Sequence, residues 1–496
     1  MRASPYRLVI LMSNQSLPIR RVAPTGVCLL TLGCKLNQAD SEAIARDLLA
    51  AGCQVVDRPA AADAFVINTC SVTHVADRKA RHLTRLARRL SPGAPVIVTG
   101  CYVETAGPGP RAAMNADLVL RNDEKPSLAA RLVSLGACQP GGGAGAAPRL
   151  DPLTSLRTRA FLKVQEGCND VCAFCIVPRT RGRERSVPVE EVVRAVRARE
   201  EEGVREVVLT GTQLGAYRPA HQTDRGNGTA GSGPRVLLQT LLAETAVPRL
   251  RLSSLQPQDI TPGLLSLWEN PRLCRHFHLA LQSGSDAVLS RMRRRYTADD
   301  FRRALSLIRR HVPDATVTTD VIAGFPGESE ADFEETCAFC REAAFAALHV
   351  FPYSRRPGTV AARPPLADDQ VPEPVKRERT HRLLALAQDL RADFEGRFHG
   401  RVMPVLWERA RPTEGSLLWE GLTDNYLRVF THSDANLWNR ILAVRLTDSA
   451  GSTEPASRTG GPGEVEGGVW GDIIWTPRAY QACPVGRQAC LSVRQV

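Results

Sequence analysis

Apolar runs and helical patterns alternate along the first part of the chain, starting near residue 27. The apolar runs are of the kind that forms buried strands, and the stretches between them have apolar residues at helical spacing. The predicted strands cover 27–34, 64–70 and 95–101, and the predicted helices cover 41–52 and 76–90. Strands that alternate with helices in this way predict a parallel sheet with helices packed against it.

A second strand–helix series follows a Gly-, Pro- and Ala-rich stretch at 139–148, whose composition is typical of a flexible linker. Residues 221–234 resemble a surface insertion, and a Pro-rich stretch near 357–374 leads into a predicted helix at 374–398. The series contains six strand candidates: 161–164, 206–209, 250–253, 276–281, 315–321 and 346–351. The middle of the chain is therefore predicted to be a second α/β unit.

The pattern changes beyond residue 400, where short apolar segments replace the strand–helix alternation. These segments predict a small antiparallel sheet or barrel, interrupted by a low-complexity stretch at 451–468. No internal repeat of fixed period is visible. We therefore expect a third, β-rich unit.

Composition narrows the choice of partner and compartment. The 496 residues carry a formal net charge of +12, from 64 Lys and Arg against 52 Asp and Glu, which favours a polyanionic partner without requiring one. Aromatic residues make up 5% of the chain, so nucleic-acid binding would depend on charge more than on stacking. The apolar run at 8–12 is too short for a secretory signal, and no run approaches the roughly 18 apolar residues of a membrane span. We expect a cytoplasmic protein without membrane association, in which grouped cysteines indicate metal binding or catalysis.

Three cysteines in one short loop form the first candidate site. Cys168, Cys172 and Cys175 have the spacing C-x3-C-x2-C and follow the strand candidate 161–164, at the end of a strand where α/β folds place their sites. Three thiolates hold three irons of a 4Fe-4S cluster and leave the fourth iron open to a small molecule, whereas an electron carrier uses four thiolates. Spacing alone leaves a zinc site or buried, metal-free cysteines as alternatives.

A second set of cysteines is spread along the sequence. Cys34, Cys70 and Cys101 each end one of the three N-terminal strand candidates. Neighbouring strands lie about 5 Å apart, so the three strand ends can converge on one pocket, although simple packing of buried cysteines is an equal alternative. A second CAFC sequence, with Cys337 and Cys340, lies in a helical pattern without a third cysteine nearby, which predicts core packing.

The sequence around the cysteines resembles the radical S-adenosylmethionine (SAM) methylthiotransferases. Phe174 completes the C-x3-C-x-aromatic-C signature of radical SAM enzymes, and the resemblance runs from about residue 27 to 445. Within the family, GCKLNQADSE is most similar to the MtaB-type branch, which acts on N6-threonylcarbamoyladenosine in tRNA. The motifs that carry the resemblance are TLGCKLNQADSE (31–42), NTCSVTHVADRKAR (68–81), VTGCY (98–102), GCNDVCAFCIVPRTRGRERS (167–186), LTGTQLGAY (209–217), HLALQSGSDAVLSRMRRRYT (278–297), TTDVIAGFPGESEADFEET (318–336) and HVFPYSRRPGTVAA (349–362).

The resemblance implies an α/β protein of three domains, which refines the division expected from the pattern. The insertions at 221–234 and 451–468 are longer than the family pattern, but neither touches the six cysteines. The expected parts are an N-terminal extension (1–24), a Rossmann-like methylthiotransferase domain (25–138), a linker (139–153), a partial (βα)6 radical-SAM barrel of the TIM type (154–386), an OB-like, RNA-binding TRAM domain (387–476, interrupted at 451–468) and a tail (477–496).

The resemblance also implies two 4Fe-4S clusters and SAM as cofactors. The first would bind and cleave SAM, and the second, auxiliary cluster would carry the sulfur; their expected ligands are Cys168, Cys172 and Cys175 for the first and Cys34, Cys70 and Cys101 for the second. The implied product is 2-methylthio-N6-threonylcarbamoyladenosine at position 37 of tRNA, in which C–S–CH3 replaces the C–H at carbon 2 of the adenine. An unreactive aromatic C–H has no acidic proton for a base to remove, so a cofactor-made radical is needed and no further catalytic residue is expected. An electron donor such as flavodoxin or ferredoxin and a sulfur source would be partners beside the tRNA.

Two glycines and several arginines are predicted to contact SAM and RNA. Gly211 and Gly324 lie in motifs that resemble SAM-contacting strand ends, where glycine permits close approach of the backbone to the cofactor; a tight turn without ligand is the alternative. Basic runs beside the cluster motifs favour contact with tRNA phosphates over a solvated surface. The arginines assigned to RNA are Arg179, Arg181, Arg183, Arg293 and Arg294.

Other charged and polar residues are assigned no direct role. The basic helix at 76–90 is interpreted as a solvated face, and His74, His278 and His349 as structural residues.

Two alternatives to the implied function stay open. One is the same chemistry on N6-isopentenyladenosine tRNA or on a ribosomal protein, and the other is a non-catalytic iron–sulfur or zinc RNA-binding protein.

Overall fold

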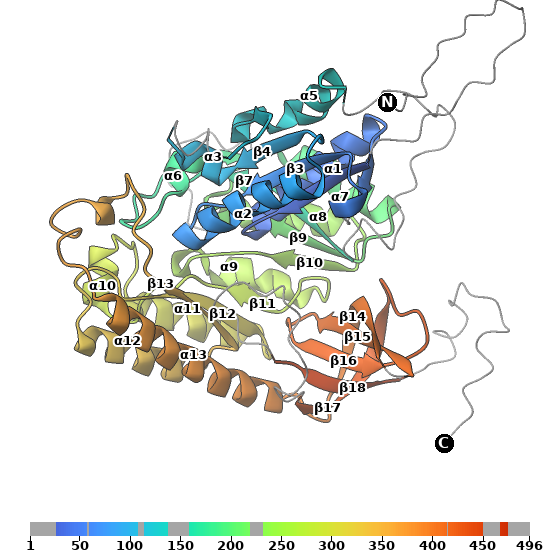
Figure 1. The fold of residues 1–496 in the computed structure, drawn as a ribbon. Coiled ribbons are helices and arrows are strands. Elements are labelled where there is room, and N and C mark those ends of the chain that lie inside the picture. The colour runs from blue at the N-terminus through green and yellow to red at the C-terminus, as the bar shows by residue number, and fades with distance from the viewer. Residues whose placement is uncertain are drawn as a thin grey trace, which may run out of the picture.

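The computed structural model describes residues 26–56, 59–107, 114–136, 158–218, 232–413, 415–449 and 467–474. The predicted extension (1–24), linker (139–153) and tail (477–496), with most of both insertions, lie outside these residues. Three units follow one another along the described chain. Figure 1 shows the N-terminal unit in blue against the green strands of the middle unit, and the C-terminal unit in orange and red at one end of the molecule.

The N-terminal unit is a five-stranded sheet in the order β2-β1-β3-β4-β5, in which every pair is parallel. The three predicted strands are confirmed as β1, β3 and β4. The inner strands β3 and β4 are buried along their whole length, which is why they are apolar without alternation. The elements are β1 Gly26–Thr31, α1 Lys35–Ala50, β2 Gln54–Val56, β3 Ala64–Thr69, α2 His74–Leu90, β4 Val96–Gly100, α3 Cys101–Thr105, β5 Leu118–Val119 and α5 Leu128–Ser134.

The helix predicted at 41–52 begins earlier, at Lys35. Cys34 is consequently the residue that precedes the first turn of α1, in a bend beyond β1, and does not belong to the strand itself. The first turns were missed because polar residues outnumber the apolar Leu36 and Ala39 between residues 35 and 42.

The middle unit contains six parallel strands in two hydrogen-bonded groups, β6-β9-β10 and β11-β12-β13. Backbone bonds from Leu250 N to Arg272 O and from Leu255 N to His278 O join the two groups into one open barrel. All six strand candidates are confirmed, as β6 Arg159–Lys163, β9 Glu206–Thr210, β10 Arg249–Leu252, β11 His276–His278, β12 Thr316–Ala323 and β13 Ala347–Pro352. A short antiparallel pair, β7 Gln165–Glu166 and β8 Arg185–Ser186, closes the loop after β6.

Helices cover the outside of this open barrel. Cys337 and Cys340 lie on the buried face of α12 among the residues of the main core, so their predicted packing role is confirmed. The helices are α6 Val177–Thr180, α7 Val189–Glu201, α8 Ser232–Glu244, α9 Pro262–Leu265, α10 Asp286–Arg291, α11 Ala298–His311, α12 Glu330–Ala343 and α13 Glu373–Gly396.

The C-terminal unit is a closed barrel in the order β14-β15-β16-β18-β17. The predicted small antiparallel sheet or barrel is confirmed as a barrel, whose strand pairs are antiparallel except for β16 and β18, which pair in parallel. The predicted boundary at 386/387 falls inside α13, which continues to the foot of the barrel. The strands are β14 Val402–Thr413, β15 Ser416–Thr423, β16 Arg428–His432, β17 Ile441–Ser449 and β18 Val469–Ile473.

Contacts between the units close the open barrel at its edge and at its base. Helix α1 packs along the free edge of β6, where the Glu42 carboxylate accepts a hydrogen bond from Phe161 N at 3.0 Å. At the amino ends of the strands, Arg249 donates to Leu422 O at 2.9 Å and to Pro404 O at 2.6 Å in the C-terminal barrel. The cysteine loop lies at the carboxyl ends of the strands, where the N-terminal unit also makes contact, as in the hydrogen bond from Arg356 Nη2 to Ser71 Oγ at 2.6 Å.

Candidate active site

The loop after β6 carries Cys168, Cys172 and Cys175, each of them partly exposed. Cys168 N donates to Gly182 O at 3.1 Å, which ties the two ends of the loop together beside the β7–β8 pair. Two side chains from other loops, after β9 and after α10, contact the thiols. The Cys168 thiol lies 3.4 Å from Gln213 Oε1, and Arg294 donates to Cys172 Sγ at 3.3 Å.

The electrostatics of this loop fit a bound cation. Burial, with the negative charge of neighbouring groups, raises the pKa of Cys168 to about 11 and that of Cys175 to about 12. These two thiols therefore keep their protons unless a positive charge stabilises the thiolates, and metal binding supplies that charge. The donor set and its one-loop geometry match a cluster held by three thiolates.

The second set of cysteines also comes together. Cys34 precedes α1, Cys70 follows β3 and Cys101 opens α3 directly after β4. Burial, and then the charges of Cys34 and Cys101, raises the pKa of Cys70 to about 12. The three thiols are thus within electrostatic reach of one another, at the carboxyl edge of the N-terminal sheet. Cys34 is exposed while Cys70 and Cys101 are buried, so the pocket has one open side.

A buried ionic network joins the two cysteine sets. Asp40 of α1 accepts from Lys125 Nζ at 2.6 Å, from Lys163 Nζ at 2.8 Å and from Arg181 Nη1 at 2.7 Å. Burial alone would raise the pKa of Asp40, but these three cations outweigh it and hold that pKa well below its usual range. Arg181 also pairs with Glu166 at 2.6 Å, and the negative charges of Cys101, Asp40, Glu166 and Cys34 raise the pKa of Arg181 well above its usual range.

The network corrects one of the RNA assignments. Arg181 is 4% exposed and its guanidinium is fully engaged by Asp40, Glu166 and Asn37, so it positions the two cysteine sets and is not free to bind phosphate. From the sequence alone, Arg181 was grouped with the basic residues beside it. The sequence of a basic loop does not indicate which one of its arginines is buried.

The other predicted arginines divide into two kinds. Arg179, Arg183 and Arg293 are exposed, as an RNA contact requires. Arg294 turns inward, where it donates to Cys172 Sγ and to the Tyr296 hydroxyl at 3.0 Å. Tyr296 in turn donates to Leu281 O at 3.0 Å, beyond the end of β11. Arg294 is therefore a positioning residue of the first cysteine loop.

The two predicted glycines lie at strand ends, as their motifs indicate. A Cβ on Gly211 would come within 3.0 Å of the Gln165 side chain. Gly324 has φ +72°, and a Cβ there would meet Lys376 Cγ at 2.1 Å. Packing alone thus requires glycine at Gly324, and the SAM contact of both residues stays a prediction.

A polar cluster inside the open barrel was not recognised as part of the site. His278 Nε2 and His349 Nδ1 lie 3.2 Å and 3.1 Å from the two oxygens of Asp320. The three groups converge within 4.8 Å and could hold a metal ion, yet their mutual hydrogen bonds already satisfy the carboxylate. The signal in the sequence was the alternation of polar residues inside buried strands, as in His276-x-His278 and Thr318-x-Asp320.

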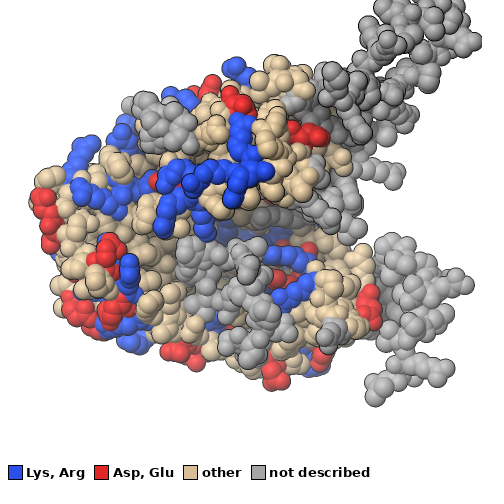
Figure 2. All heavy atoms as spheres, in the orientation of Figure 1, with Lys and Arg blue, Asp and Glu red and all other residues tan. Residues whose placement is uncertain are grey.

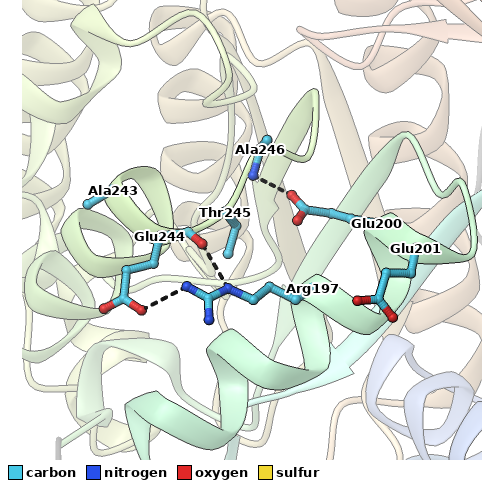
Figure 3. Close-up of a pocket in the computed structure, with 7 residues that line it drawn as sticks. All are labelled: Arg197, Glu200, Glu201, Ala243, Glu244, Thr245 and Ala246. Carbon is cyan, nitrogen blue, oxygen red and sulfur yellow. Dashed lines mark hydrogen bonds and ion pairs between the residues drawn. The ribbon is translucent and has the colours of Figure 1, made fainter.

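Figure 3 shows a depression elsewhere, on the outer surface between α7 and α8. It contains no cysteine or histidine, and Arg197 within it pairs with Glu244 at 3.2 Å. Glu200 accepts a hydrogen bond from Ala246 N, and we assign the depression no role. The lining residues are Arg197, Glu200, Glu201, Ala243, Glu244, Thr245 and Ala246.

Cations gather on one face of the N-terminal unit. Figure 2 shows Lys and Arg side chains clustered over α2, the helix that starts shortly after Cys70. The exposed members are Arg78, Lys79, Arg85 and Arg89. None of the helices in the described part of the chain has the length and hydropathy that a bilayer span requires.

Family models and curated relatives match most of the chain. The Radical SAM superfamily matches residues 162–340, and the family described as Uncharacterized protein family UPF0004 matches residues 26–120. The chain is 38% identical over 427 residues to the threonylcarbamoyladenosine tRNA methylthiotransferase MtaB of Bacillus subtilis (strain 168), covering 84% of this chain and 92% of that protein. It is 36% identical over 408 residues to MtaB of Aquifex aeolicus (strain VF5), covering 80% and 95%. It is also 36% identical over 433 residues to the tRNA-2-methylthio-N(6)-dimethylallyladenosine synthase of Sorangium cellulosum (strain So ce56), covering 80% and 85%.

An open parallel barrel with a three-cysteine loop at its carboxyl edge defines a radical SAM enzyme, which uses a 4Fe-4S cluster and SAM. The chain belongs to the MtaB-type radical SAM methylthiotransferase family, whose members transfer a sulfur-containing group. The resemblance expected from the sequence motifs is confirmed.

Proposed function

We propose that this enzyme converts N6-threonylcarbamoyladenosine at position 37 of tRNA to its 2-methylthio derivative. The observation that carries the proposal is the match to MtaB of Bacillus subtilis over 84% of this chain, together with the sequence GCKLNQADSE at the first cysteine. The tRNA is the polyanionic partner that the net charge of +12 favours.

We infer that the chain holds two 4Fe-4S clusters, the first at Cys168, Cys172 and Cys175 and the second at Cys34, Cys70 and Cys101. When bound, the clusters and SAM supply the electron, the radical and the sulfur that replacement of C–H by C–S requires. The residues of the chain hold the two clusters in position relative to each other. Arg294 orients Cys172, and the Asp40–Arg181 pair fixes the distance between the two cysteine sets.

We further propose that tRNA lies across the N-terminal and middle units. The exposed cations of α2, with Arg179, Arg183 and Arg293, would contact its phosphates, and the C-terminal barrel would act as the RNA-binding TRAM domain. The division into a methylthiotransferase domain (25–138), a radical SAM core (154–386) and a TRAM domain (387–476) belongs to the same proposal. A flavodoxin- or ferredoxin-like electron donor and a sulfur source complete the set of partners.

Nucleoside mass spectrometry of tRNA from a deletion strain tests the substrate. We expect the 2-methylthio-threonylcarbamoyl nucleoside to disappear and its unmethylthiolated precursor to accumulate, with recovery on expression of this chain. Persistence of the methylthiolated nucleoside in a strain without a second such enzyme contradicts the proposal.

One alternative substrate has specific support. The 36% identity to a dimethylallyladenosine synthase favours isopentenyladenosine as the second candidate. Loss of the 2-methylthio-isopentenyl nucleoside in the same experiment identifies it.

A further inference from the structure

Polar side chains cover the inner face of the open barrel on β11, β12 and β13. Register pairs place His276 opposite Thr316 and His278 opposite Thr318, while Asp320 lies opposite His349. Alternate residues of a strand share one face, so the histidines, Thr318 and Asp320 stand side by side. A barrel interior without a polar ligand is ordinarily filled by branched apolar side chains.

Hydrogen bonds link these groups in a row. The Thr318 hydroxyl lies 2.9 Å from His278 Nδ1 and 3.1 Å from His276 Nε2, and Asp320 accepts from His278 and His349. The side chains of Asp320 and His349 are 30% and 32% exposed, so a ligand can reach them. His276 Nδ1 is buried and has no hydrogen-bond partner among the described residues.

The C-terminal barrel adds an aromatic ring to the row. Tyr426 lies in the turn between β15 and β16, and its ring stacks on His276 at 4.4 Å between centroids. Three cations surround the ring, with Arg251 at 4.9 Å and Arg159 and Lys35 at 5.7 Å from its centroid.

Only one of these cations lacks an anionic partner. Arg251 pairs with Glu206 at 2.6 Å, and Arg159 pairs with Glu408 at 2.5 Å. Lys35 makes no hydrogen bond or ion pair with any described residue, although it is only half-exposed. A partly buried ammonium without a counter-ion favours an anionic ligand beside it.

The residues around the row connect to both cysteine sets. Lys35 follows Cys34 directly in the sequence. At the other end, Tyr296 bonds Leu281 O just beyond β11 and bonds Arg294, which reaches Cys172. A substrate that must meet both cysteine sets therefore faces this row.

We propose that Lys35 and the row His276, His278, Asp320 and His349 bind the N6 substituent of the modified adenosine and select one that bears a carboxylate and hydrogen-bonding groups. This inference rests on the proposed function and names the part of the site that reads the substrate. The threonylcarbamoyl group offers a carboxylate for the Lys35 ammonium and a hydroxyl and urea for the imidazoles. A prenyl group would leave these polar groups desolvated and unpaired, which is how sites built for hydrogen bonding reject apolar analogues.

Binding of synthetic anticodon stem-loops to the full-length, reconstituted enzyme tests the proposal by fluorescence anisotropy. The three probes carry adenosine, threonylcarbamoyladenosine or isopentenyladenosine at position 37. We expect the wild type to prefer the threonylcarbamoyl probe over the isopentenyl probe by roughly tenfold or more, as one charge-assisted contact provides. Lys35→Met removes most of this preference, and Lys35→Arg retains it in part.

Lys79→Met is the matched control, because Lys79 is an exposed lysine on α2 outside the barrel. It lowers the affinity for all three probes by a common factor and leaves the preference intact. SAM cleavage without RNA, which should survive in Lys35→Met, shows that the variant is folded and loaded.

The outcomes separate the two proposals. If the wild type prefers the threonylcarbamoyl probe and Lys35→Met keeps that preference, the role of Lys35 is overturned while the proposed function stands. If the wild type prefers the isopentenyl probe, the proposed function fails and this inference fails with it. His349→Phe tests the row itself. A lower preference of this variant for the threonylcarbamoyl probe over the isopentenyl probe supports the role of the row. An unchanged preference overturns that role and limits the recognition site to Lys35.

Discussion

The two cysteine sets differ in how the chain holds them, and their separate roles can be tested residue by residue. One set shares a loop closed by β7 and β8, and the other joins three strand ends. Loss of a ligand in one set should therefore leave the other intact.

Cys172→Ala is expected to abolish SAM cleavage, whereas Cys70→Ala should retain SAM cleavage and stop methylthiolation. Iron analysis after anaerobic reconstitution should give about eight irons for the wild type and about four for either variant. Identical behaviour of the two variants in the SAM cleavage assay would contradict the division of roles. Zinc or about four irons in the wild type would favour a non-catalytic metal-binding protein.

Asp40→Asn is expected to destabilise the fold by about 3–5 kcal/mol, because it leaves Lys125 buried without its anion and Arg181 with Glu166 as its remaining anionic partner. The folded pKa of Asp40 is depressed, so its contribution is complete above the unfolded pKa of about 4 and is lost as pH falls below that value. Denaturant unfolding should therefore show a constant gap between wild type and variant from pH 8 to 5. A gap that already shrinks between pH 8 and 6 would show that Asp40 is not held by these cations.

Gly324→Ala should destabilise the protein by more than about 1 kcal/mol, from its positive φ and the contact of the new Cβ with Lys376. Gly203→Ala is the matched control, since Gly203 has φ +81° but nothing within 4 Å of an added Cβ. Thermal unfolding with and without SAM measures both. If Gly324→Ala lowers the midpoint only when SAM is present, the glycine serves the cofactor and not the packing.

At the scale of elements, α2 is the clearest candidate for an RNA contact outside the cysteine loops. Replacing the four exposed cations Arg78, Lys79, Arg85 and Arg89 with Gln should weaken tRNA binding and reduce the slope of log K against log salt by about 0.7–0.9 for each lost phosphate contact. Filter binding over a range of salt concentrations measures the slope.

Helix α11 provides the control for α2. Arg302 pairs with Glu342 and Arg303 pairs with Asp300, so these exposed arginines already have anionic partners. Their replacement with Gln should leave the salt slope unchanged. An equal loss from both helices would mean that total charge, and not the face over α2, governs binding.

At the scale of the whole molecule, the C-terminal barrel is docked on the amino ends of the middle strands through buried arginines. Arg249→Met should loosen this docking, because two carbonyl oxygens at the interface, Leu422 O and Pro404 O, lose their donor. Hydrogen exchange should accelerate in β14 and β15 while the N-terminal sheet keeps its protection. Acceleration spread evenly over the chain would instead indicate a global loss of stability.

The parallel architecture and the cysteine sets were predictable because their signals are local or periodic. Six apolar strand candidates separated by helical patterns predicted the parallel α/β fold of the middle unit. The C-x3-C-x2-C spacing predicted the first cysteine site within one loop. The structure brings Cys34, Cys70 and Cys101 near one another because parallel strands end at one edge of a sheet, and their role as cluster ligands stays a prediction.

Contacts between side chains that are far apart in the sequence were decided only by the tertiary structure. Arg181 and Arg183 are nearly adjacent in a basic run, yet the fold buries the first against Asp40 and exposes the second. Lys35 and Tyr426 stand far apart in the sequence and meet inside the barrel, where the turn after β15 enters its base. Burial and long-range pairing depend on how whole elements pack, which no spacing of neighbouring residues encodes. The sequence therefore indicated the class of enzyme, and the packing of its three units decided which charged side chains are buried in pairs and which are left without an anionic partner among the described residues.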